Sequence, residues 1–246
     1  MIKQKFSKGT ITQIIFLITV ILLVVVRINI ILGLPIYGYI DYVDDDQLQV
    51  HQAKSLLEGN WLGNYGYNTL LKGPVFPMFL AFICFFKIPY IFSITFVYTI
   101  ACCLFIYSIK DVIKNKIALL IVLAFMLFNP IMFSSSFQRV YRNSLTPTLA
   151  ITLISFFNIA LVNRNQNNIT KYTIGLILAS IVFPFFYYVR EDSIWLVPFI
   201  LFYSFIILTN IISEFVKKKK AKNSCNPYIY IKMRTFNITS NNVNTV

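Results

Sequence analysis

The chain is poor in acidic residues, histidine and cysteine. Only 9 Asp and Glu residues and one histidine, His51, occur among 246 residues, against 22 Lys and Arg residues. The four cysteines form no CxxC pair, so the sequence supports neither a zinc site nor a disulfide framework. Most basic residues lie in short segments between apolar runs, where orientation in a bilayer accounts for them. The net charge of +13 therefore does not indicate nucleic-acid binding.

Long apolar runs dominate the rest of the sequence. Hydrophobic residues make up 57% of the chain and the mean hydropathy is +0.70, more apolar than a soluble domain. A bilayer demands roughly 20 apolar residues per helix. The predicted spans are residues 11–34, 90–109, 117–133, 148–162, 172–189 and 194–212. Residues 75–86 are too short to cross, so the sequence predicts an all-α polytopic integral membrane protein with about six transmembrane helices.

The basic residues give these spans an orientation. With the N-terminus in the cytoplasm, fifteen of the 22 Lys and Arg residues fall on the cytoplasmic side, as the positive-inside tendency requires. Counting residues 75–86 as a span would place the Lys110 and Lys217 clusters outside. We therefore expect an extracytoplasmic first loop at residues 35–89 and cytoplasmic termini. The predicted membrane module is residues 1–216, followed by a basic, poorly ordered tail at residues 217–246.

A single cation, Arg27, interrupts the first span near its outer third. Such a residue can extend its charged group to the membrane boundary, form a structural ion pair or face a protein-lined cavity. We expect one of the first two arrangements.

The first loop contains the densest group of carboxylates in the chain. Asp44, Asp45 and Asp46 precede a predicted helix at residues 47–58, whose composition suits a helix lying on a bilayer surface. A carboxylate at such a place can act as a general base on a hydroxyl group. Asp45 is the preferred candidate, with Asp44 as its neighbour. Asp46 could equally cap the helix, because it stands three residues before Gln49.

Two further charged segments belong to the same predicted face. Arg139 and Arg142 follow the third span, and Arg190 follows the fifth. Arginine binds phosphate through charge-assisted, bidentate hydrogen bonds, so these three residues are candidate phosphate ligands. Alternatively, they could pair with carboxylates or end a helix. Three additional candidates for the site are Lys72, Glu191 and Asp192.

A longer pattern across the first loop resembles a known family, the GT-C membrane glycosyltransferases, related to protein O-mannosyltransferases and lipid A aminoarabinose transferases. The pattern comprises Asp45-Asp46, Ala53, Leu57, Gly59-Asn60-Trp61-Leu62-Gly63, Tyr65, Thr69-Leu70, Lys72-Gly73-Pro74, Pro77 and Phe79-Leu80. Residues 129–130, 139–143 and 190–193 are similar to later motifs of bacterial members. The likeness covers roughly residues 11–212.

This resemblance implies sugar transfer. In the superfamily an outer-loop aspartate is the catalytic base, the donor is a polyprenyl-phosphate sugar, and the anomeric carbon is inverted. Carried over, Asp45 or its neighbours would activate an acceptor hydroxyl on a glycan, lipid or protein. The donor phosphate would contact Arg139, Arg142 or Arg190. Some members use a divalent metal, which the aspartate trio could bind, and others use none.

Members of this family usually have more spans and a further outer loop or domain. The resemblance therefore implies that the chain corresponds to an N-terminal half, whose activity alone is open. The resemblance implies a membrane glycosyltransferase, or its N-terminal module, at the extracytoplasmic face of a bacterial plasma membrane. The alternatives are a non-catalytic protein that binds or translocates a lipid-linked sugar, and an inactive truncated fragment.

Overall fold

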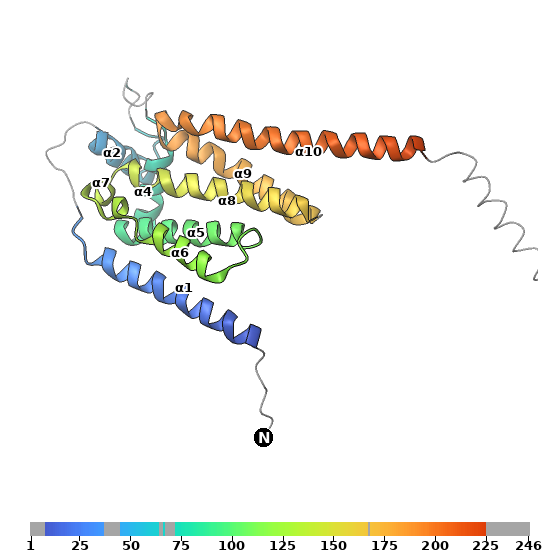
Figure 1. The fold of residues 1–246 in the computed structure, drawn as a ribbon. Coiled ribbons are helices and arrows are strands. Elements are labelled where there is room, and N and C mark those ends of the chain that lie inside the picture. The colour runs from blue at the N-terminus through green and yellow to red at the C-terminus, as the bar shows by residue number, and fades with distance from the viewer. Residues whose placement is uncertain (1–7, 37–44, 64–65, 67–71, 167, 225–246) are drawn as a thin grey trace, which may run out of the picture. The chain divides into compact units, whose positions relative to one another are not determined.

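The computed structural model describes residues 8–36, 45–63, 66, 72–166 and 168–224 (Figure 1). The chain divides into two compact units, residues 1–196 and residues 197–246. The elements of the first unit are α1 (Lys8–Leu32), α2 (Asp45–Leu57), α4 (Val75–Phe85), α5 (Tyr90–Ile109), α6 (Lys116–Leu127), η1 (Pro130–Phe133), α7 (Ser135–Gln138), η2 (Arg142–Ser144), α8 (Thr146–Asn165), α9 (Ile169–Val189) and η3 (Glu191–Leu196). The second unit contains α10 (Val197–Ser224).

Six segments of the described chain are helical, long and apolar enough to cross a membrane. They are Thr10–Leu32, Tyr90–Ile109, Lys116–Phe133, Arg142–Arg164, Ile169–Val189 and Ile194–Lys217. These segments coincide with the six predicted spans, and the described residues contain no β-strand. The protein is an all-α polytopic integral membrane protein, which confirms the predicted fold class.

The short apolar segment forms helix α4, Val75–Phe85, which has 11 residues and is not of spanning length. Pro77 lies in its first turn, where the missing N–H of proline removes no helical hydrogen bond. Helices α2, α4 and α7 lie together at one end of α5, α6 and α8 (Figure 1). Phe76 and Leu80 of α4 form a buried cluster with Ala53 of α2 and Val189 of α9. The first-loop helix is thereby fixed against the membrane helices.

Small residues allow α8 and α9 to approach closely. A Cβ atom at Gly175 would lie 3.0 Å from the backbone nitrogen of Ala160 and 3.1 Å from the carbonyl oxygen of Phe156. Ala160 and Ala179 are also buried. Such small side chains are typical of helix contacts in membranes, where close backbone packing replaces the hydrophobic drive.

The third span is interrupted near one end. Helix α6 ends at Leu127, and the side chain of Asn129 accepts a hydrogen bond from the Ile131 backbone amide at the start of η1. Pro130 occupies the first position of η1, where its fixed φ angle suits a helix start. The apolar run of residues 117–133 is therefore two helical pieces.

Arg27 does not extend to the membrane boundary and forms no ion pair in the described part of the chain. It is 2% exposed and donates a hydrogen bond from Nη1 to the carbonyl oxygen of Leu127 at the end of α6. Its guanidinium lies 4.5 Å from the ring centroid of Tyr98 and 5.6 Å from that of Phe133. The expectation for Arg27 was therefore wrong, because a helix end and two aromatic faces stabilise the cation inside the protein.

Candidate functional site

Asp46 and Arg139 form an ion pair between two segments that are far apart in the sequence. Asp46 lies in the first turn of α2, and Arg139 follows α7 in extended conformation. The Nε of Arg139 donates to Oδ2 of Asp46. The Asp46 side chain is 10% exposed and that of Arg139 is 26% exposed, so the pair is largely shielded from solvent. This contact fixes the acidic start of α2 beside the arginine segment.

The ion pair replaces the capping role that the sequence allowed for Asp46. Helix α2 begins at Asp45, so Asp46 lies inside the helix, and its second oxygen, Oδ1, is buried without a hydrogen-bond partner. A capping aspartate would instead accept a hydrogen bond from a backbone amide two or three residues later. Asp46 therefore acts across the fold and not within its own helix.

Two glutamines continue the buried side of α2 from Asp46. Gln49 and Gln52, at intervals of three residues, are 1% and 2% exposed. Oε1 of Gln49 and both amide atoms of Gln52 have no hydrogen-bond partner. Val50 and Leu57, in contrast, are about half exposed. Helix α2 thus buries Asp46, Gln49 and Gln52. A helix lying on a bilayer surface would instead expose its polar residues to water.

We call the set of side chains around this ion pair the charged junction, which comprises Asp46, Arg139, Tyr141, Arg142, Asn143 and Arg190. Arg142 is 6% exposed and its Nε donates to the hydroxyl of Tyr141 at 3.2 Å. The guanidinium groups of Arg139 and Arg142 lie 5.4 Å and 5.2 Å from the centroid of the same Tyr141 ring. One aromatic ring therefore stabilises two cations within a short stretch of chain.

Arg190 connects the end of α9 to the charged junction. It follows the last residue of α9, and its Nη1 donates to Oδ1 of Asn143 at 2.9 Å. The three charged segments named in the sequence are thereby joined through two contacts, one from Asp46 to Arg139 and one from Arg190 to Asn143. Arg190 therefore contacts a side-chain amide of the arginine segment.

The loop before α4 approaches the same end of α9. A Cβ atom at Gly73 would lie 1.8 Å from the carbonyl oxygen of Tyr188, so only glycine fits there. Lys72 is half-buried beside it. Among the other predicted site residues, Asp44 and the side chains of Asp45, Glu191 and Asp192 lie outside the described residues.

Tyr90 supports the charged junction and was not identified from the sequence. Its hydroxyl donates to the carbonyl oxygen of Arg139 at 3.0 Å and lies 2.8 Å from Oγ of Ser144. Tyr90 is the first residue of α5, so it ties the arginine segment to the start of a span. Gln49 and Gln52 were also missed as site residues, because only their burial distinguishes them from polar residues on a helix surface.

A metal site is not formed by the described residues. No group of three or more His, Cys, Asp or Glu side chains gathers in this part of the chain. The carboxylate of Asp46 is engaged by Arg139 through one oxygen. The site can therefore be described as an anionic helix start, a buried polar row and three guanidinium groups.

Comparison of the chain with protein-family models, with curated proteins and with solved structures gave no match. The fold and the charged junction together define a polytopic membrane protein with a charged site at the end of its apolar helices. Charged residues in such positions are functional candidates by default.

Proposed function

We propose that the protein is a membrane glycosyltransferase, or the N-terminal module of one, that moves a sugar from a polyprenyl-phosphate donor to an acceptor hydroxyl. The ion pair between Asp46 and Arg139 is the observation that carries this proposal. It places the start of the acidic helix next to a segment rich in guanidinium groups, and such a transfer needs both a base and a phosphate-binding cation.

The contacts suggest a division of roles. Asp46 is held by Arg139, so we assign it to positioning, and we assign the general base to Asp45, with Asp44 as the alternative. Asp45 is the first residue of α2 and is directly next to the anchored Asp46. The base would accept the proton of the acceptor hydroxyl while the oxygen of that hydroxyl attacks the anomeric carbon. The bond from that carbon to the phosphate oxygen would break, and polyprenyl phosphate would leave.

The remaining arginines suit the leaving phosphate. Negative charge grows on the phosphate as the glycosidic bond breaks, and positioned guanidinium groups stabilise it most where water is excluded. Arg142 is nearly fully buried, and Arg190 is oriented by its hydrogen bond to Asn143. We therefore assign donor-phosphate binding to Arg142 and Arg190, with Arg139 linking them to the base segment.

The buried amides of α2 suit a polyhydroxylated ligand. Leaving a buried donor or acceptor unpaired costs about 1–3 kcal/mol, and Gln49 and Gln52 have three such atoms. Hydroxyl groups can both donate to and accept from amides. We assign these glutamines to binding the hydroxyl groups of the donor sugar or of the acceptor.

Orientation completes the proposal. The distribution of Lys and Arg residues supports cytoplasmic termini, and with that orientation the charged junction would lie at the extracytoplasmic face. We propose that the membrane is a bacterial plasma membrane. Donor, acceptor and product would then meet outside the cytoplasm, where the sugar is supplied on its lipid carrier.

The test is a transfer assay in isolated membranes with labelled polyprenyl-phosphate sugars. Asp44→Asn, Asp45→Asn and Asp46→Asn are compared with Glu58→Gln, which removes one carboxylate from the exposed end of the same loop. We expect Asp45→Asn to abolish transfer and Glu58→Gln to leave it unchanged. Transfer by all three Asn variants at the wild-type rate would refute the proposal. Donor binding by the wild type without product would favour the binding or translocating alternative.

A further inference from the structure

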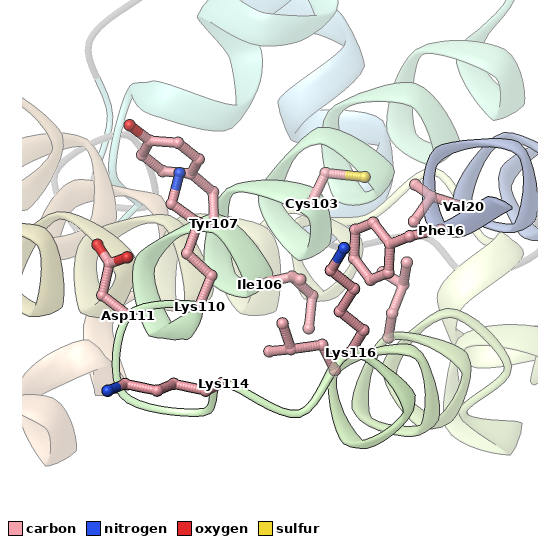
Figure 2. Close-up of a pocket in the computed structure, with 11 residues that line it drawn as sticks. Phe16, Val20, Cys103, Ile106, Tyr107, Lys110, Asp111, Lys114 and Lys116 are labelled. Carbon is pink, nitrogen blue, oxygen red and sulfur yellow. The ribbon is translucent and has the colours of Figure 1, made fainter. Parts of the chain in front are cut away.

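A second site is formed at the end of the membrane helices away from the charged junction. A cavity of about 440 Å³ lies among α1, α5 and α6 (Figure 2). This volume is within the usual range for small-molecule pockets. Its walls are apolar and come from all three helices, with Phe16, Val20, Ile106, Leu119 and Leu123 among them. All three helices are long and apolar enough to span the membrane, so the cavity lies between membrane helices.

The rim of the cavity is cationic. Lys110, Lys114 and Lys116 line it, with Asp111 as the one acidic residue among its described lining residues. All four charges belong to the connection between α5 and α6 or to the first residue of α6 (Figure 2). The Nζ of Lys110 lies 3.8 Å from the ring centroid of Tyr107, which holds that cation at the rim. The rim therefore carries a net positive charge.

An apolar cavity with a cationic rim at the end of a membrane span matches one kind of molecule. Such a ligand needs an apolar chain for the walls and an anionic group for the lysines. Basic pockets between transmembrane helices bind the head groups of anionic lipids in this way. A small anion would leave the apolar walls unfilled, and a neutral lipid would leave the lysines unpaired.

We propose that this cavity binds an anionic phospholipid of the surrounding bilayer, with an acyl chain between Phe16, Val20 and Leu123 and the phosphate at the lysine rim. The site is separate from the charged junction, so it does not depend on the glycosyltransferase proposal. A bound lipid would stabilise the packing of α1 against α5 and α6.

The experiment measures lipid binding to the purified full chain by native mass spectrometry. Phosphatidylglycerol and phosphatidylcholine with identical acyl chains are added separately. Lys114→Gln, Lys116→Gln and the double variant are compared with Lys171→Gln, an exposed lysine at the start of α9 that does not line the cavity. Each lysine near a membrane surface contributes to anionic-lipid binding by a factor of about five. We expect the wild type to prefer phosphatidylglycerol and each rim variant to lose about fivefold of its affinity, with Lys171→Gln unchanged.

Two further arms separate the possible ligands. Val20→Trp fills the cavity and should weaken the binding of phosphatidylglycerol, while all lysines remain. Glycerol phosphate, which has the anionic group without the acyl chain, should not displace the lipid. Equal affinity for the two lipids, an unchanged preference in the double variant, or full displacement by glycerol phosphate would each overturn the proposal.

Discussion

The ion pair between Asp46 and Arg139 makes a quantitative prediction about the coupling of α2 to the arginine segment. Two opposite charges about 4 Å apart attract by about 4 kcal/mol at the effective dielectric constant of a protein near its surface. Arg139 is 26% exposed and Asp46 is 10% exposed, so solvent screening reduces this value. We therefore expect a coupling free energy of about 2 kcal/mol.

A double-mutant cycle measures this coupling directly. Asp46→Asn, Arg139→Gln and the double variant are unfolded reversibly by SDS in mixed micelles and followed by circular dichroism. Each single variant should lower the free energy of unfolding by about 2–3 kcal/mol, because it removes a charge–charge attraction that is largely shielded from solvent. The double variant should be less destabilised than the sum of the two single variants.

The exposed pair of Lys54 and Glu58 provides the matched control. Their charged atoms lie 3.9 Å apart within one helical turn, and their side chains are 73% and 55% exposed. The cycle with Lys54→Gln and Glu58→Gln should show a coupling of about 0.5 kcal/mol or less. If the Asp46 and Arg139 variants are additive to within about 0.5 kcal/mol, the reasoning that joins the two segments is refuted.

Three further predictions follow from the described contacts. Gly73→Ala should lower the melting temperature and Gly66→Ala should not, because an added Cβ meets the Tyr188 backbone at the first position and nothing within 4 Å at the second; equal melting of both variants would contradict this. Gln52→Leu should raise the free energy of unfolding by about 1 kcal/mol or more and reduce sugar transfer, because it removes two unpaired buried atoms; a variant less stable than the wild type would argue against a ligand role. Arg27→Met should lower the free energy of unfolding by roughly 1–3 kcal/mol, because the Leu127 carbonyl loses its donor, and unchanged stability would show that this hydrogen bond contributes nothing.

The spans could be predicted from the sequence because length and apolarity alone decide which helices can cross a bilayer. The same length criterion excluded residues 75–86 as a span, and this segment forms the short helix α4. Chain composition therefore determined the membrane fold without knowledge of any contact.

The side chains that the helices turn inward could not be predicted in the same way. A helix lying on a bilayer surface, as predicted for residues 47–58, would turn its glutamines toward water. Arg27 was expected to extend to the membrane boundary or to form an ion pair. Both predictions assumed that polar groups face water. Arg27 is buried instead, because its guanidinium donates to the Leu127 carbonyl oxygen and lies over the Tyr98 ring. Such tertiary contacts have no signal in local spacing.

The charged junction was predicted in its residue types but not in its connections. The sequence named Asp46, Arg139 and Arg190 because charge is rare in this chain. It did not indicate that Asn143 would accept a hydrogen bond from Arg190, or that Tyr90 would donate one to the backbone carbonyl of Arg139. Asn143 was noted only as part of a motif, without a partner, and tyrosine is common at the ends of membrane helices, so Tyr90 carried no distinguishing signal.

The most direct test of the account is a cross-link between α2 and the arginine segment. Asp46→Cys and Arg139→Cys are combined in a chain whose four native cysteines are replaced by alanine, and a short bifunctional thiol reagent is added to membranes. Lys54→Cys with Arg139→Cys serves as the control, because Lys54 lies on the exposed side of α2. The account predicts that the first pair is bridged within one chain and that the control pair is not. Equal yields for the two pairs would contradict the docking of the acidic helix on the arginines, on which the proposed function depends.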